Sequence, residues 1–249
     1  MNSARKLFTV LENLCINGHQ GVSELSSNLK LGKSSIHRFL SVLVETGYVG
    51  KNPDNKKYFA TLKLFEIGAM VRSRIRLIPI ARPYMEKMGT QFHETINLGY
   101  FDGDEVVYVD KVESAETLRM DLGIGRRVPA YCTALGKVFL ANLREQEIKG
   151  YFERVKLIPR TIKTITSERE LMKNFKVIRK QGYAIDDREL DMGIRCIAAP
   201  VRDDLCRVTA AISIAGPSMR LGPEKMKQFK EVLMEATKQI SNQLGFSRP

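Results

Sequence analysis

The stretch VSELSSNLKLGKSSIHRFLSVLVETGY, residues 22–48, contains two short helical patterns that meet at Gly32. In the second pattern, apolar side chains recur at the three- and four-residue spacing of one buried helix face: Ile36, Phe39, Leu40, Leu43 and Val44. The first pattern has a narrower apolar seam. Two helices joined by a short, glycine-containing turn indicate a helix-turn-helix, whose second helix lies in the major groove of DNA.

The outer face of the second helix is polar. Because the N-terminal residues of a recognition helix lie nearest the bases, we expect four side chains of this face to approach bases or nearby phosphates: Ser34, Ser35, His37 and Arg38. Two short strand-like runs follow at residues 47–49 and 57–60, with a turn-rich segment between them.

A basic hairpin directly after a recognition helix is typical of the wing of a winged helix, whose lysines contact phosphate and position the domain. The candidate phosphate contacts are Lys33, Lys51, Lys56 and Lys57. A solvated loop is the alternative interpretation of this hairpin.

Residues 62–74 are apolar on almost every side of a predicted helix, so one face is expected to be buried outside its own domain. A winged helix reads one half-site, and specificity generally comes from a two-fold dimer on a near-palindromic duplex. We therefore interpret residues 62–76 as a linker helix that also helps the chain to dimerise. It would connect a DNA-binding domain at residues 1–61 to a second domain at residues 77–249.

Positive charge is concentrated in the N-terminal part of the chain. The net charge of the 249 residues is +12, and residues 1–76 hold 12 Lys/Arg against 5 Asp/Glu. This distribution favours a polyanionic partner for that part. No apolar run reaches the roughly 18 residues that a membrane span needs, and the N-terminus carries a helical apolar stripe instead of a signal peptide. We expect a cytoplasmic protein without a membrane partner.

Four cysteines are scattered along the chain without metal-ligand spacing: Cys15, Cys132, Cys196 and Cys206. We expect free thiols, no metal and no cofactor. A redox sensor is an alternative, since Arg195 or Arg207 could activate a neighbouring thiol. An enzyme that uses Asp186 with Cys196 is a weaker alternative, because no histidine lies nearby in sequence to activate the thiol.

The second domain is expected to contain six strands, at residues 95–101, 106–112, 118–122, 183–186, 196–201 and 208–215. Helices are expected between and after them, at residues 134–143, 145–153, 167–181 and from Pro223 to near Gly245. This order indicates an α+β domain built on one antiparallel or mixed sheet.

Three stretches of this domain could line a binding pocket. Residues 131–137 place small residues at a helix start, where backbone N–H groups can approach an anion, although an ordinary helix start fits equally well. The acidic stretch at residues 183–196 could hold Asp186 and Cys196 towards a pocket, or could be a solvated loop. The last strand places Ser213 and Ala215 on one face, which suits either a pocket wall or a core strand.

The chain resembles the IclR-type bacterial transcriptional regulators over nearly its whole length. The resemblance rests on SSIHRFLSVLVETGYV, VPAYCTALGKVFLA, GYAIDDRELDMGIRCIAAPV and AAISIAGP. It implies a winged helix-turn-helix followed by a GAF-like effector domain, assembled as homodimers or dimers of dimers. Members of the family are regulators and not enzymes. They bind small organic effectors, often carboxylates, and effector binding changes their affinity for operator DNA.

The resemblance also implies an effector pocket in the second domain. Its residues would be Met120, Val128, Ala134, Leu135, Asp186, Cys196, Ser213 and Ala215. Among them, Ala134 and Leu135 would offer backbone N–H groups to an effector carboxylate. Ala215 stands where some members have a second serine, and the turn at residues 133–136 is bulkier than a glycine-rich version. Both departures remove polarity or room, so a larger or more apolar effector is favoured over a small keto acid.

Overall fold

The computed structural model describes residues 2–119 and 123–246. The chain divides into two compact units, Met1–Ile75 and Arg76–Pro249. Among the described residues, no helix is long and apolar enough to cross a membrane. Each unit has its own buried core, so each is described separately.

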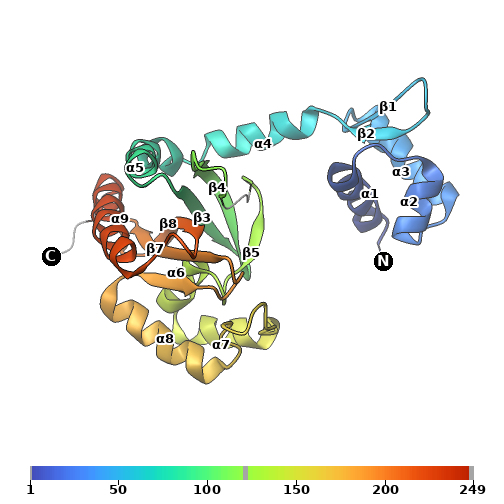
Figure 1. Cartoon of the computed structure of the whole chain (residues 1–249). Coiled ribbons are helices and arrows are strands. Elements are labelled where there is room, and N and C mark those ends of the chain that lie inside the picture. The colour runs from blue at the N-terminus through green and yellow to red at the C-terminus, as the bar shows by residue number, and fades with distance from the viewer. Residues whose placement is uncertain (1, 120–122, 247–249) are drawn as a thin grey trace. The chain divides into compact units, whose positions relative to one another are not determined.

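The first unit is a winged helix (Figure 1). Its elements are α1 (Ser3–Asn17), α2 (Val22–Leu29), α3 (Lys33–Glu45), β1 (Val49–Lys51), β2 (Tyr58–Ala60) and α4 (Lys63–Ser73). Gly18 ends α1 with a positive φ of 70° and donates its N–H to the carbonyl of Leu14. Strands β1 and β2 pair antiparallel to form the wing. The expected helix-turn-helix is therefore confirmed.

The core of the first unit is the apolar face of α3 packed against α1, α2 and the hairpin. Its fully buried side chains are Val10, Leu11, Leu14, Leu25, Ile36, Phe39, Leu40, Leu43, Val49 and Tyr58. The expectation that Val44 shares this face is wrong, since the Val44 side chain is 40% exposed. It lies in the last turn of α3, at the edge of the apolar stripe. The structure therefore buries a narrower face of α3 than the sequence pattern suggests.

Helix α4 is anchored to the first unit at its N-terminal end. Lys63 donates to the carbonyl of Thr46 at 2.6 Å and lies over the ring of Tyr48, 4.7 Å from the ring centroid. Leu64 packs against the core of the unit. No residue of α4 is buried.

The second unit is one six-stranded antiparallel sheet with helices on both faces (Figure 1). Its strands are β3 (Thr95–Asp102), β4 (Glu105–Val112), β5 (Arg127–Pro129), β6 (Ala184–Asp187), β7 (Ile194–Arg202) and β8 (Val208–Pro217). Its helices are α5 (Leu77–Phe92), α6 (Ala134–Asn142), α7 (Glu145–Arg154), α8 (Glu168–Gln181) and α9 (Pro223–Gln243). The order across the sheet is β5-β4-β3-β8-β7-β6. The α+β two-domain expectation is confirmed, with every strand pair antiparallel.

The two faces of the sheet carry different side chains. Helices α5 and α9 pack on one face, and α6 packs on the other with α8 beyond it. On β3, Ile96 lies beside Gly89 of α5, whereas Gly99 faces Leu135 of α6. Side chains of a strand alternate between faces, so Asn97 shares the α6 face. Its register partner on β8 is Ser213, which places both residues under the start of α6.

The predicted strand at residues 118–122 is wrong where it can be tested. Leu118 and Arg119 belong to no strand, and the other three positions, including Met120, lie outside the described residues. The strand that follows β4 is β5, which is not among the six expected strands. It has only three residues and buries only Val128, so it is too short to show an alternating pattern.

Leu40→Ala should lower the free energy of unfolding of the first unit by about 2–5 kcal/mol, because Leu40 is 1% exposed and leaves a cavity. Urea unfolding followed by circular dichroism measures the change. Val42→Ala on the same helix is the control, because Val42 is 41% exposed and its truncation should change stability by less than about 0.5 kcal/mol. Equal losses in the two variants would contradict the assignment of the core.

Candidate DNA-binding face and ligand pocket

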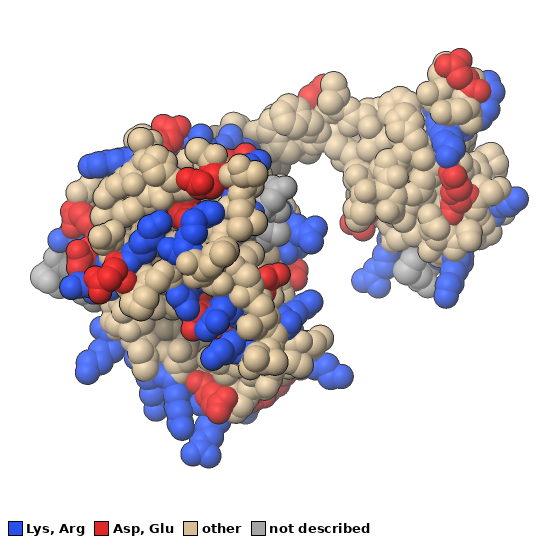
Figure 2. Space-filling view, in the orientation of Figure 1, with Lys and Arg blue, Asp and Glu red and all other residues tan. Residues whose placement is uncertain are grey.

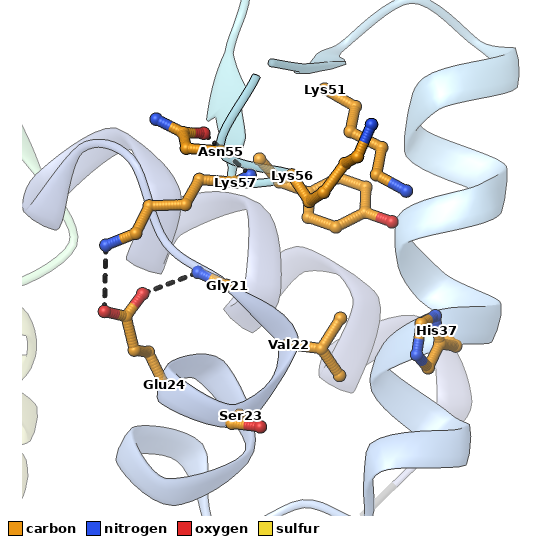
Figure 3. A pocket seen from close by; sticks show the side chains of 10 residues that line it. Gly21, Val22, Ser23, Glu24, His37, Lys51, Asn55, Lys56 and Lys57 are labelled. Carbon is orange, nitrogen blue, oxygen red and sulfur yellow. Dashed lines mark hydrogen bonds and ion pairs between the residues drawn. The ribbon is translucent and has the colours of Figure 1, made fainter. Parts of the chain in front are cut away.

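A groove of about 380 Å³ separates the wing from the helix-turn-helix in the first unit (Figure 3). It is lined by the N-terminal turn of α2, by His37 of α3 and by the three wing lysines Lys51, Lys56 and Lys57. The structure thus brings four of the predicted DNA contacts to one groove. The other four, Lys33, Ser34, Ser35 and Arg38, lie outside the groove on α3.

The α3 residues are open to a partner. Lys33, Ser34, His37 and Arg38 are exposed, and Ser35 is half-buried. Within the part of the chain that the structure describes, no hydrogen bond or ion pair holds the side chain of Ser34, His37 or Arg38. The Arg38 guanidinium lies 5.4 Å from the centroid of the Phe39 ring. These side chains can therefore reorient towards bases without breaking a polar contact in the protein.

The wing lysines Lys57 and Lys51 have different partners within the first unit. Lys57 forms an ion pair with Glu24 of α2 at 2.9 Å, and the second oxygen of Glu24 accepts the Gly21 N–H at 2.6 Å (Figure 3). These two partners, the Gly21 N–H first, lower the pKa of Glu24. Lys51 lies over the ring of Tyr58, 5.3 Å from its centroid. Lys57 thus has an acidic partner within its own unit, whereas among the described residues Lys51 contacts an aromatic ring and forms no ion pair.

Basic side chains gather along the wing, with acidic ones among them (Figure 2). Glu24 and Asp54 are the acidic residues placed in and beside the wing groove. The ion pair between Lys57 and Glu24 is exposed to solvent, and exposed pairs contribute little to stability. A phosphate could therefore displace Glu24 from Lys57 at little cost.

The second candidate site is a small cavity between the sheet and the start of α6. It is lined by Tyr108, Thr133, Ala134, Leu135, Asp186, Leu190, Cys196 and Ser213. Its volume is about 10 Å³, which is room for about one water molecule. Any organic ligand larger than water must widen this cavity.

The cavity brings together five residues that the sequence reasoning placed in a pocket: Ala134, Leu135, Asp186, Cys196 and Ser213. Val128 and Ala215 are buried in the adjoining core but do not line the cavity. Met120 lies outside the described residues. The sequence reasoning missed Tyr108, Thr133 and Leu190. The alternation along β4 could have identified Tyr108, but no sequence signal marks Leu190.

Helix α6 begins at the cavity, and two backbone N–H groups in its first turn are not used within the helix. Thr133 caps the helix: its hydroxyl accepts the Gly136 N–H at 3.2 Å and donates to the Pro129 carbonyl at 2.9 Å. The Lys137 N–H bonds to the Thr133 carbonyl. Among the described residues, the N–H groups of Ala134 and Leu135 have no hydrogen-bond partner. A helix N-terminus with free N–H groups favours an anion.

Beneath the helix start lies a buried charged cluster, which we call the pocket floor: Lys137, Asp186 and Glu189. Lys137 is 1% exposed, forms an ion pair with Glu189 and donates to the Ile185 carbonyl. Asp186 is also 1% exposed and accepts the Glu189 N–H at 2.7 Å. The cluster thus contains two carboxylates and one ammonium group.

Burial raises the pKa of the Asp186 carboxyl to about 7, although the Glu189 N–H and the Lys137 charge oppose the shift. The neighbouring thiols also shift. Burial, and then the charge of Asp186, raises the pKa of Cys132 to about 12 and that of Cys196 well above its usual value. Both pocket thiols are therefore protonated at neutral pH, which is unfavourable for a thiolate nucleophile.

Asn97 extends the polar wall behind Ser213, and the sequence reasoning missed it. Its side-chain N–H donates to the Ser213 hydroxyl at 3.4 Å, and Asn97 is 1% exposed. The register between β3 and β8 produces this contact across 116 positions of sequence. An alternating pattern predicts the face of each strand, but not which strand lies beside it.

Two family models match the chain. The C-terminal domain of the bacterial transcriptional regulator IclR matches residues 69–242, and the IclR helix-turn-helix domain matches residues 3–53. The HTH-type transcriptional regulator KdgR of Escherichia coli is 39% identical over 246 residues, which cover 99% of this chain and 94% of the relative. The relatives are named as regulators, and neither these names nor the pocket thiols support the redox alternative.

Two solved structures resemble the whole chain. The IclR of Thermotoga maritima has a TM-score of 0.83 and 36% sequence identity, and the match covers 99% of this chain and 100% of that chain. An IclR homolog from Microbacterium hydrocarbonoxydans, complexed with 4-hydroxybenzoate, has a TM-score of 0.84 at 22% identity, covering 98% and 99% of the two chains. At 22% sequence identity, the match to the Microbacterium hydrocarbonoxydans protein shows only that the two chains share a fold.

Gly136→Ala should destabilise the second unit by about 1–3 kcal/mol, because a Cβ there would overlap the backbone of Ala130 and push the start of α6 away from the pocket. Urea unfolding measures the loss. Gly150→Ala in α7 is the control, since its added methyl group would meet only the flexible end of Arg154. Equal stability of the two variants would show that the close approach at Gly136 is not required.

Proposed function

The chain belongs to the IclR family of bacterial transcriptional regulators, and we propose how its two units perform that function. The first unit binds operator DNA through α3 and the wing. The second unit binds a small organic acid in the cavity at the start of α6, and this binding changes the affinity for DNA. The observation that carries the proposal is the convergence of free helix N–H groups, Ser213 and Asp186 on one small cavity.

For DNA binding, the exposed residues of α3 read the major groove. Arg38 is the residue best suited to a specific base contact, because its guanidinium can bond guanine in a bidentate way. Ser34, Ser35 and His37 contact bases or nearby phosphates. Lys33, Lys51, Lys56 and Lys57 hold the phosphate backbone, with Lys57 first released from Glu24.

A two-fold assembly on a near-palindromic operator fits the exposed surface of α4. Four large apolar side chains at this helix are more than half exposed: Leu62, Phe65, Met70 and Val71. Burying a large apolar side chain contributes about 1.5–3 kcal/mol, so a second copy of the chain is the natural partner for this face. The assembly is a homodimer or a dimer of dimers.

For the effector, the helix N-terminus favours a carboxylate, and the apolar lining from Leu135 and Leu190 favours a carbon skeleton beside it. The complex of the fold neighbour with 4-hydroxybenzoate supports the same class, a small aromatic or hydroxylated acid. Because the cavity has room for little more than one water, binding must displace neighbouring segments. That displacement is the means by which the second unit can bias DNA binding.

Arg38→Ala should lower the affinity for an operator duplex by about 1–3 kcal/mol and leave binding to random-sequence duplex almost unchanged. The operator is first selected from random duplexes with the wild-type chain, and affinities are measured by fluorescence anisotropy. Lys51→Ala is the contrast: it should weaken binding to both duplexes and reduce the dependence on salt. A loss shared equally by both duplexes in Arg38→Ala would contradict its role in reading bases.

A thermal-shift screen of the full chain against small carboxylates should identify acids that raise the melting temperature. Binding to the folded state alone contributes about 2.7 kcal/mol at a hundred times the dissociation constant. Ser213→Ala should reduce the shift, because the acid loses a hydrogen bond of about 0.5–1.5 kcal/mol. Ser34→Ala, on the other unit, should keep the full shift. A shift that survives in Ser213→Ala would place the acid elsewhere.

A further inference from the structure

The pocket floor contains two acidic side chains, Asp186 and Glu189, and only one basic side chain, Lys137. Among the described residues, the only cation that contacts the two carboxylates of the floor is Lys137, and its ammonium group is already paired with Glu189 and hydrogen-bonded to the Ile185 carbonyl. Glu189 and Lys137 are both buried. Asp186 is left with backbone N–H groups as its partners. One buried carboxylate therefore has no counter-charge of its own.

The other groups that face Asp186 supply no positive charge. Tyr108 of β4, Cys196 of β7 and Cys132 before α6 all interact with it, and burial raises the pKa of each, so all three are neutral near pH 7. The remaining charged neighbours are Lys137 and Glu189. The Glu189 carboxylate raises the pKa of Asp186 further. The environment as a whole thus favours the neutral form of this carboxyl.

A carboxylate ligand would add a further negative charge beside Asp186. The helix start and Asp186 line the same small cavity, so an anion at the N–H groups of Ala134 and Leu135 would share that cavity with Asp186. Two carboxylates in one buried site disfavour the doubly charged state, and one of them then takes up a proton. Asp186 is the group placed to accept it, because it lines the cavity and has no counter-charge of its own, whereas Glu189 is already paired with Lys137.

We propose that the acidic effector binds together with one proton, which resides on Asp186 as a neutral carboxylic acid. The proton comes from solvent and adds to a side-chain oxygen of Asp186, with no other bond made or broken. The resulting O–H can donate a hydrogen bond into the cavity, where Ser213 and the ligand are the acceptors. This inference rests on the proposed function, in which the cavity takes a carboxylate. Effector binding then strengthens as the pH falls.

The protonation of Asp186 is testable without any ligand. A carboxyl whose pKa is higher in the folded than in the unfolded state destabilises the fold increasingly as the pH rises between the two values, and by a constant amount above the folded value. In Asp186→Asn this penalty is absent, while the amide oxygen can still accept the Glu189 N–H. The melting temperature of the variant, relative to wild type, should therefore rise between about pH 4 and 7 and level off above.

Asp204→Asn, which changes an exposed aspartate of the same unit, is the matched control and should show a constant difference over this range. A constant difference in Asp186→Asn as well would overturn the proposal. Should Asp186→Asn fail to fold, carboxyl ¹³C NMR of the aspartate-labelled wild-type chain decides the question. One aspartate should titrate near neutral pH, and the absence of such a residue would equally overturn the proposal.

Calorimetric titration with 4-hydroxybenzoate as the probe tests the coupling itself. In wild type, the affinity should fall about tenfold per pH unit above about pH 7, whereas in Asp186→Asn it should be independent of pH. The uncharged 4-hydroxybenzamide should show no such dependence with either protein. An affinity of 4-hydroxybenzoate that does not change with pH in wild type would overturn the coupling. Failure of the probe to bind would count against the proposed effector class, and the ligand-free titration would still decide the state of Asp186.

Discussion

The start of α6 in the second unit is fixed by one buried ammonium group, which lies near two buried carboxylates and is paired with only one of them. Lys137 reaches from α6 to Glu189 and to the carbonyl of Ile185, and so ties the helix to the acidic loop after β6. Removing one partner of a buried ion pair typically costs about 3–5 kcal/mol, although the intact pair adds little stability. The pair is therefore better understood as a device that fixes the position of α6 and leaves Asp186 as a titratable group.

Close packing around α6 determines where the start of this helix lies relative to the sheet. Gly136 lets the helix approach the backbone of Ala130, and Gly99 of β3 makes room for Leu135. The helix start thus comes down onto the polar side of the sheet, where Ser213 and Asn97 meet across neighbouring strands. A cavity this tight would have to open to admit the acid that we propose as its ligand. That property suits a regulator whose output is a change of DNA affinity more than it suits an enzyme.

Much of the fold could be predicted from the sequence, because its signals are local. The spacing of Ile36, Phe39 and Leu40 indicated the buried face of α3, and turn residues indicated the wing. Strand β5 was missed because three residues are too few to show alternation. The site was predicted less completely. Local patterns marked Ala134, Asp186 and Ser213 only as candidates beside ordinary alternatives, and the family resemblance then assigned them to a pocket. The Glu24–Lys57 and Asn97–Ser213 contacts depend on tertiary pairing that no local pattern encodes.

The central claim is that a ligand bound in the cavity of the second unit changes the affinity of the first unit for operator DNA. Fluorescence anisotropy of an operator duplex, titrated with the full chain in the presence and absence of an acid that binds it, tests this claim most directly. We predict a shift in the dissociation constant for wild type, and none for Ser213→Leu, whose larger side chain fills the cavity. The same operator affinity with and without bound acid in wild type would contradict the account.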